Sequence, residues 1–159
     1  MKLYLDTSAI LKRYLAEEGT EIADLVFDKA EAGEIRLMIS LWNVGEVFGV
    51  LDEHKRKGWL NEKAFKAALT SFADELVKLV RLRALEVMPL SAPVIAGAWN
   101  ILMDYHIYEA DALQISTCLA FQHDLLLSGD NRLVEIGKKA GLHAFNVVQD
   151  KQGLLNLLQ

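Results

Sequence analysis

Short apolar runs alternate along the chain with longer stretches in which apolar residues recur at helical spacing. The short runs predict buried strands over residues 2–6, 35–40, 84–90, 124–128 and 143–148. The periodic stretches predict helices over residues 7–15, 20–33, 41–57, 61–83, 92–105, 109–123 and 131–140, with a last helical turn in 153–159. Strands that alternate with helices are typical of a parallel sheet covered on both faces, so we expect an α/β fold.

Local signals place several helix ends and give no sign of a domain boundary. Thr20 is expected to cap a helix that ends at Gly33, and Asn61 to cap the long helix that follows the basic turn. The chain contains no linker, internal repeat or low-complexity segment. We therefore expect one domain over residues 1–159, with residues 59–83 forming a helical arm on it.

The composition is that of a folded globular chain. Hydrophobic residues make up 52% and charged residues 25% of the 159 residues, which excludes a disordered chain. A chain of this length buries roughly 68–70% of the surface that it exposes when unfolded. No apolar run approaches the ~18 residues of a membrane span, and the sequence opens on a strand pattern, so we expect no membrane segment or signal peptide. Cys118 is the only cysteine, which excludes an intrachain disulfide and favours a cytoplasmic location.

The net charge of −5 argues at first against a nucleic-acid partner, because phosphate binding usually needs a basic surface. If four of the 22 acidic residues formed a metal site, however, bound divalent ions would offset much of their charge. Basic residues also cluster at 12–13, 55–57 and 138–139, where each cluster could equally be a solvated helix face. Net charge alone does not decide whether the protein binds a nucleic acid.

Four carboxylates lie where the predicted elements meet. Asp6 and Asp130 follow apolar strands, whereas Glu46 and Asp111 lie near the starts of apolar helices. Ligands of parallel α/β sheets bind beyond the carboxyl ends of the strands, and right-handed connections can bring all four side chains to that edge. Carboxylates packed together repel, and a hard divalent cation relieves the repulsion. We therefore predict an oxygen-only site for Mg²⁺ or Mn²⁺ that would activate water for phosphodiester hydrolysis.

Each carboxylate also has a purely structural interpretation. Asp111 could only stabilise the first turn of its helix, and Asp130 could only cap the helix that follows it. Asp6 could be a turn residue. Glu46 is the hardest to explain in this way, because its helix neighbours are apolar and a buried carboxylate without a partner is costly. Gly45 beside it would permit close backbone approach.

The flanks of these carboxylates resemble one protein family over nearly the whole chain. LYLDTSAILKRY resembles the opening strand of a PIN-domain ribonuclease, with its first metal aspartate and the hydroxyl residues after it. NVGEVFGVL resembles the glutamate helix of that family, and YEADALQISTCLAF its third acidic motif. LLLSGDNRLVEIGKKAGL resembles its last motif, in which Ser or Thr lies two residues before an aspartate. The order of the four motifs is most similar to that of the VapC toxins of toxin–antitoxin systems.

The resemblance implies a fold, an activity and partners. The fold is a three-layer α/β/α sandwich with a five-stranded parallel sheet, and the activity is Mg²⁺- or Mn²⁺-dependent endonucleolytic cleavage of single-stranded RNA. The metal-binding and catalytic acids that it implies are Asp6, Glu46, Asp111 and Asp130. Ser8 and Ser128 are implied as groups that support the site. The implied partners are a VapB-like antitoxin and further copies of the chain, in a homodimer or higher homo-oligomer.

Two other functions share some of these sequence features. A phosphatase of the haloacid dehalogenase type also opens with a strand and an aspartate, but it needs a second aspartate two residues later, where this chain has Ser8. A catalytically silent PIN-fold binding module would act through protein partners alone. Such a module has no need to retain four carboxylates, so we favour the ribonuclease.

Overall fold

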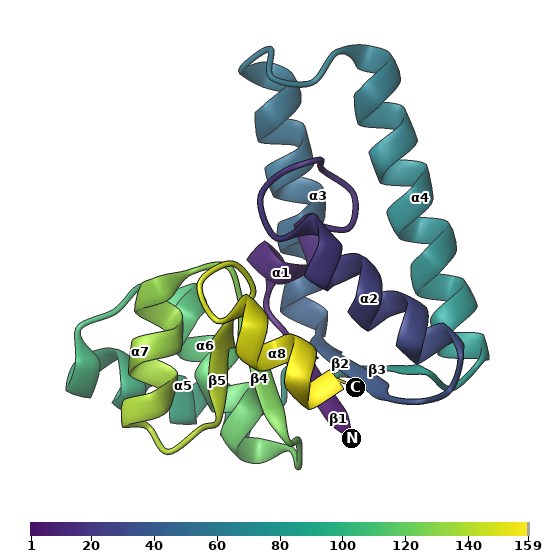
Figure 1. Ribbon diagram of the computed structural model, residues 1–159. Coiled ribbons are helices and arrows are strands. Elements are labelled where there is room, and N and C mark those ends of the chain that lie inside the picture. The colour runs from purple at the N-terminus through teal and green to yellow at the C-terminus, as the bar shows by residue number, and fades with distance from the viewer. Residues whose placement is uncertain (159) are drawn as a thin grey trace.

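A computed structural model describes residues 1–158, which form a sheet flanked by helices (Figure 1). The strands are β1 (Lys2–Leu5), β2 (Arg36–Ser40), β3 (Leu85–Met88), β4 (Leu125–Ser128) and β5 (Ala144–Asn146). They pair in parallel in the order β3-β2-β1-β4-β5, which places β1 in the centre. Leu3 of β1 pairs with Leu37 of β2 on one side and Leu125 of β4 on the other. The predicted five-stranded parallel sheet is confirmed.

Helices connect the strands and cover both faces of the sheet. They are α1 (Thr7–Leu11), α2 (Thr20–Glu31), α3 (Leu41–Arg56), α4 (Glu62–Arg81), α5 (Ala92–Tyr105), α6 (Glu109–Ala120), α7 (Asn131–Lys139) and α8 (Lys151–Leu158). Between residues 1 and 158, none of these helices has the length and apolar character needed to cross a membrane.

Alternation along the strands divides the core between the two faces. Leu3 and Leu5 of β1 are buried in a cluster that also contains residues of α1 to α4 and α8. Tyr4, between them, points to the opposite face and is buried with residues of α5, α6 and α7. The helices thus form two outer layers around the sheet, which confirms the expected three-layer α/β/α sandwich.

Local chemistry explains most helix ends, and the predicted cap at Thr20 is wrong. Asn61 caps α4 as expected, because its side chain accepts the N–H three residues later at 2.8 Å. Thr20, in contrast, is the first residue of α2, and the N-cap is Gly19 with φ +91°. The Thr20 hydroxyl instead donates to the Glu17 carbonyl at 2.7 Å and closes the preceding turn. The left-handed backbone at position 19 needs glycine, which decides where α2 begins.

The helices α3 and α4 pack as a pair that extends beyond the sheet (Figure 1). Arg13, just after α1, donates to Glu75 of α4 and to Asp24 of α2, both at 2.9 Å. The Tyr14 hydroxyl also donates to Glu75, at 2.8 Å. Phe72 of α4 is buried beside these groups. Polar and aromatic contacts therefore anchor α4 to the first two helices.

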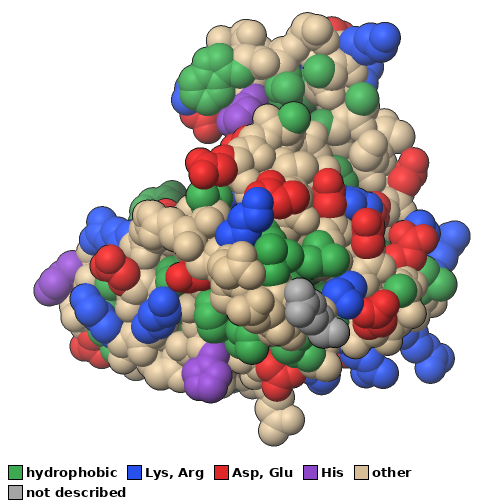
Figure 2. All heavy atoms as spheres, in the orientation of Figure 1, with side chains coloured by type: hydrophobic (Ala, Val, Ile, Leu, Met, Phe, Trp, Pro, Cys, Tyr) green, Lys and Arg blue, Asp and Glu red, His purple; other side chains and the backbone are tan. Residues whose placement is uncertain are grey.

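Charged side chains of both signs are interspersed on the surface. Figure 2 shows acidic and basic side chains intermixed on the face that carries α2, α4 and α8. Charged side chains elsewhere on the described residues also pair, including Lys55 with Glu62 at 2.7 Å and Arg56 with Asp52 at 2.8 Å. Exposed pairs of this kind contribute little to stability, so the fold is determined by the two apolar clusters rather than by surface charge.

Candidate active site

A pocket of about 210 Å³ lies beyond the carboxyl ends of β1 and β4. Its walls come from α1, α3, α6 and the loop after β4. The residues that line it are Asp6, Thr7, Ser8, Leu11, Glu46, Val50, Ala110, Asp111, Gln114 and Asp130. The fold therefore brings all four predicted carboxylates to one pocket, from positions spread over most of the chain.

Asp6 is both a helix cap and a wall of the pocket. It follows β1 directly, and its Oδ1 accepts the Ala9 N–H at 2.9 Å, which caps α1. Its carboxylate also accepts the hydroxyl hydrogens of Ser8 at 2.8 Å and Ser128 at 2.9 Å. Burial raises the pKa of Asp6 to about 6, because desolvation of the charged form outweighs these hydrogen bonds, which lower it. Asp6 is 5% exposed.

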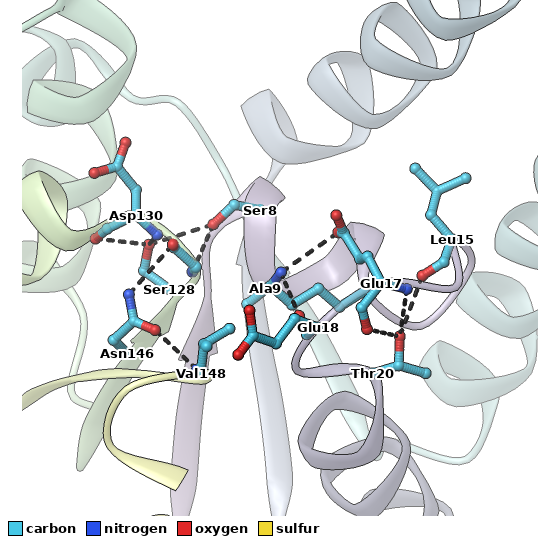
Figure 3. A network of polar contacts seen from close by, with 12 residues as sticks. Ser8, Ala9, Leu15, Glu17, Glu18, Thr20, Ser128, Asp130, Asn146 and Val148 are labelled. Atoms are coloured by element: carbon cyan, nitrogen blue, oxygen red, sulfur yellow. Dashed lines mark hydrogen bonds and ion pairs between the residues drawn. The ribbon is translucent and has the colours of Figure 1, made fainter. Parts of the chain in front are cut away.

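Ser8 and Ser128 join Asp6 to the loop that carries Asp130. Figure 3 shows the two serines beside Asp130. The Ser8 Oγ accepts the Gly129 N–H at 2.7 Å, and the Ser128 Oγ accepts the Asp130 N–H at 2.8 Å. A Cβ atom at position 129 would lie 2.8 Å from Lys12 Cε and 3.1 Å from Ser8 Oγ. Glycine at position 129 therefore allows the loop to lie against α1.

Glu46 is half-buried and faces polar partners rather than the apolar surroundings that its sequence neighbours suggested. Its Oε2 accepts the Thr7 hydroxyl at 2.6 Å and the Gln114 Nε2 at 3.1 Å. Val47, the next residue in α3, faces the core and is fully buried. The expected close backbone approach at Gly45 is wrong, because a Cβ atom there would have nothing within 4 Å. The helix α3 thus directs the Glu46 side chain toward the pocket, whereas the Val47 side chain packs in the core.

Asp111 and Asp130 complete the acidic wall. Asp111 lies in the first turn of α6, and within residues 1–158 its carboxylate accepts no hydrogen bond. Burial raises the pKa of Asp111, and the negative charges of Asp130 and Glu46 raise it further, whereas Arg132 lowers it. Asp130 is exposed and caps α7, since its Oδ1 accepts the Arg132 N–H at 2.7 Å. The cap interpretation of Asp130 is thus correct, and the side chain lines the pocket as well.

The pocket suits a hard divalent cation by its chemistry. Its charged side chains offer only oxygen atoms, and the mutual repulsion that raises the pKa of Asp111 is what a bound cation would relieve. In the arrangement seen for residues 1–158, no three Asp, Glu, His or Cys side chains lie close enough to hold an ion. The carboxylates would have to turn further into the pocket to do so. The metal site stays a prediction.

A buried polar network behind the pocket escaped the sequence-based interpretation. Tyr4, Asn43 and Gln114 are each at most 3% exposed and come from β1, α3 and α6. The Tyr4 hydroxyl donates to Gln114 Oε1 at 2.6 Å, and the Asn43 Nδ2 donates to Thr7 Oγ1 at 3.0 Å. A polar amide inside the otherwise apolar stretch ALQI was the signal that could have identified Gln114.

Comparison with known proteins identifies the class to which this fold and pocket belong. Residues 3–139 match the PIN domain model, and the chain therefore belongs to the PIN domain family. No curated protein sequence gives a significant match. The family assignment agrees with the four motifs of the sequence.

Solved structures of other proteins share the fold at low sequence identity. PAE2754 from Pyrobaculum aerophilum is 18% identical with a TM-score of 0.65, over 99% of this chain and 95% of that one. FitAcB from Neisseria gonorrhoeae is 16% identical with a TM-score of 0.64, over 92% and 99%. VapC20 from Mycobacterium tuberculosis, described as a sarcin-ricin loop cleaving toxin, is 17% identical with a TM-score of 0.59, over 88% and 95%. At these identities the likeness establishes the fold alone.

Proposed function

We propose that this protein is a metal-dependent endoribonuclease that cleaves single-stranded RNA. The observation that carries the proposal is the convergence of Asp6, Glu46, Asp111 and Asp130 on one pocket of a PIN domain, at the edge of the sheet where α/β proteins bind ligands. A set of carboxylates that holds a divalent ion suits hydrolysis by an activated water, which requires no histidine or serine nucleophile.

The four carboxylates would hold Mg²⁺ or Mn²⁺ in this proposal. When bound, the ion supplies positive charge for the phosphate oxygens and makes a water molecule easier to deprotonate. Asp6 would provide a buried anchor whose position is fixed by α1 and by the two serines. Asp111, which has no hydrogen bond within the described residues, would be the carboxylate most free to reorient.

We further propose that the protein is the toxin of a toxin–antitoxin pair. Two solved structures with the same fold support this proposal. They are FitAcB from Neisseria gonorrhoeae and VapBC2 from Rickettsia felis bound to a DNA fragment from their promoter. By this analogy the partner is a VapB-like antitoxin. We also propose that the chain forms a homodimer or higher homo-oligomer. It would act in the cytoplasm as one domain over residues 1–159. Expression that arrests growth, with relief by the product of a neighbouring gene, would support the toxin role.

A second candidate is a catalytically silent PIN-fold module that acts through protein partners. One observation favours it, because Asp6 and Asp130 already serve as helix caps and so have a structural reason to be present. Glu46 lies beyond the first turn of α3 and has no such role, and Asp111 lies in the first turn of α6 but caps no helix. These two residues favour the enzyme.

One experiment separates the two functions. The purified protein is incubated with structured and single-stranded RNAs and Mg²⁺ or Mn²⁺, beside Asp6→Asn, an EDTA control and Asp124→Asn. Asp124 is a matched control, because its carboxylate also accepts a backbone N–H, that of Lys2 at 2.7 Å, but at the opposite end of β1 and β4. We expect cleavage by the wild type and Asp124→Asn, and a loss of at least about 100-fold in Asp6→Asn. A wild-type protein that cleaves no RNA would contradict the proposal.

A further inference from the structure

Gln114 is a buried amide whose orientation is fixed by its neighbours. It lies on α6, is 3% exposed and reaches behind the pocket toward Tyr4 of β1. The Tyr4 hydroxyl is 2.6 Å from Gln114 Oε1 and 3.1 Å from Asn43 Oδ1. Asn43 Oδ1 already accepts the backbone N–H and the hydroxyl of Ser40 at 2.7 and 2.8 Å. The single hydroxyl hydrogen of Tyr4 therefore goes to Gln114.

This bond determines which end of the Gln114 amide meets the pocket. Since Oε1 accepts from Tyr4, the Nε2 group faces the other way and donates to Glu46 Oε2 at 3.1 Å. A reversed amide would place Oε1 against the carboxylate and oppose two acceptors. The Tyr4 hydroxyl thus fixes the orientation of the Gln114 amide and, through it, the hydrogen bond from Gln114 Nε2 to Glu46 Oε2.

A second arm reaches the same carboxylate oxygen. Asn43 is fully buried in the first turn of α3 and donates through Nδ2 to Thr7 Oγ1 at 3.0 Å. The Thr7 hydroxyl, having accepted that hydrogen, donates its own to Glu46 Oε2 at 2.6 Å. Both arms end on Oε2, whereas Oε1 accepts no hydrogen bond from residues 1–158.

We infer that Gln114 and Thr7 are positioning residues that hold Glu46 by Oε2 and present Oε1 to the pocket. The inference rests on the proposed ribonuclease function, in which Glu46 is an active-site acid. Groups that orient a metal-binding carboxylate from behind are commonly needed for full activity, and their loss costs about 10- to 100-fold. Tyr4 and Asn43 act one step further back, as the groups that orient the two arms.

Kinetic measurements test the arm through Gln114. Gln114→Met keeps the length and apolar volume of the side chain but removes the amide, and Tyr4→Phe removes only the orienting hydroxyl. We expect each variant to lower kcat for RNA cleavage about 10- to 100-fold with little change in KM. The double variant should lose no more than Gln114→Met alone, because both changes act through one hydrogen bond to Glu46. Full kcat in Gln114→Met, or additive losses in the double variant, would overturn the inference.

Tyr14→Phe is the matched control, because it removes a tyrosine hydroxyl that donates to Glu75 on α4, outside the pocket. A merely structural role for Tyr4 would lower the melting temperature, as loss of the Tyr14 hydroxyl also should, without lowering kcat. We expect Tyr14→Phe to retain wild-type kcat. A kcat for Tyr4→Phe equal to that of Tyr14→Phe would contradict the positioning role.

A direct measurement keeps this inference separate from the proposed function. The side-chain amide protons of Gln114, observed by NMR in the full chain, should exchange slowly with solvent and shift in Glu46→Gln and Tyr4→Phe but not in Tyr14→Phe. If the wild type cleaves no RNA and these shifts are seen, the proposed activity fails while the network stands. If the Gln114 amide signals are unaffected by Glu46→Gln, the network is wrong whatever the activity.

Discussion

The Ser128 hydroxyl at the end of β4 donates to Asp6 Oδ2 at the end of β1 across 2.9 Å, although the two residues are 122 positions apart in the sequence. The same Ser128 Oγ accepts the Asp130 N–H at 2.8 Å. One hydroxyl therefore fixes the first and the last carboxylate of the pocket relative to each other. The order of the strands places β4 beside β1 and makes this contact possible.

Ser128→Ala should destabilise the metal-free protein more at pH 8 than at pH 4. A hydrogen bond to a charged group contributes about 1.5–3 kcal/mol and one to a neutral group about 0.5–1.5 kcal/mol, and Asp6 has a pKa of about 6. Chemical denaturation at the two pH values measures the difference. Ser116→Ala is the control, since its hydroxyl donates at 2.6 Å to the uncharged Val94 carbonyl. Equal losses at both pH values for Ser128→Ala would show that the hydroxyl does not act on Asp6.

In the metal-free protein, the free energy of unfolding of Asp6→Asn should rise relative to that of the wild type as the pH rises. The folded pKa of Asp6 is raised from 3.8 to about 6, so its contribution to stability is fully present below about pH 4 and is lost as pH rises through 6. Asparagine remains neutral and can still accept the Ala9 N–H. The shift of about two pKa units corresponds to on the order of 3 kcal/mol between pH 4 and pH 8. Melting curves between pH 4 and pH 8, with Asp124→Asn as control, measure this difference in stability. A large loss of stability in Asp6→Asn at pH 8 would instead show that Asp6 is mainly a cap.

Addition of Mn²⁺ should raise the melting temperature of the wild type. An ion at 100 times its Kd stabilises the folded state by about 2.7 kcal/mol, which is about 5–10 °C for a chain of this size. Asp111→Asn should abolish most of this shift, because it removes a carboxylate whose pKa is raised by burial and by neighbouring negative charge. Asp124→Asn should retain the shift. An equal response to Mn²⁺ in Asp111→Asn would place the bound ion outside the pocket.

Gly129→Ala should destabilise the protein, by about 1–3 kcal/mol, because the new Cβ would lie 2.8 Å from Lys12 Cε and 3.1 Å from Ser8 Oγ. Gly49→Ala makes the same chemical change inside α3, where a Cβ would have nothing within 4 Å. We expect it to stabilise the protein by about 0.5–1 kcal/mol through helix propensity. Denaturant midpoints of the two variants should therefore move in opposite directions, and a stabilised Gly129→Ala would show that the loop has room to move.

The elements were largely predictable because their signals are local. Apolar runs gave all five strands, and the end of α5 at Tyr105 agrees with the prediction. The errors lie where geometry overrides a local preference. Thr20 looks like a cap, but the turn before it needs a left-handed backbone that only glycine adopts readily, and α6 ends at Ala120 rather than at residue 123.

By itself, the sequence determined the alternation of strands and helices and the placement of Asp6, Glu46, Asp111 and Asp130 at element ends, because periodicity and capping depend on residues a few positions apart. Only the tertiary structure decided what surrounds those carboxylates. The raised pKa of Asp6 arises from its burial in the packed chain. The orientation of Gln114 and the close approach at Gly129 arise from contacts between residues 68 to 121 positions apart. Burial and hydrogen-bond partners belong to the packed chain, and no local pattern specifies them.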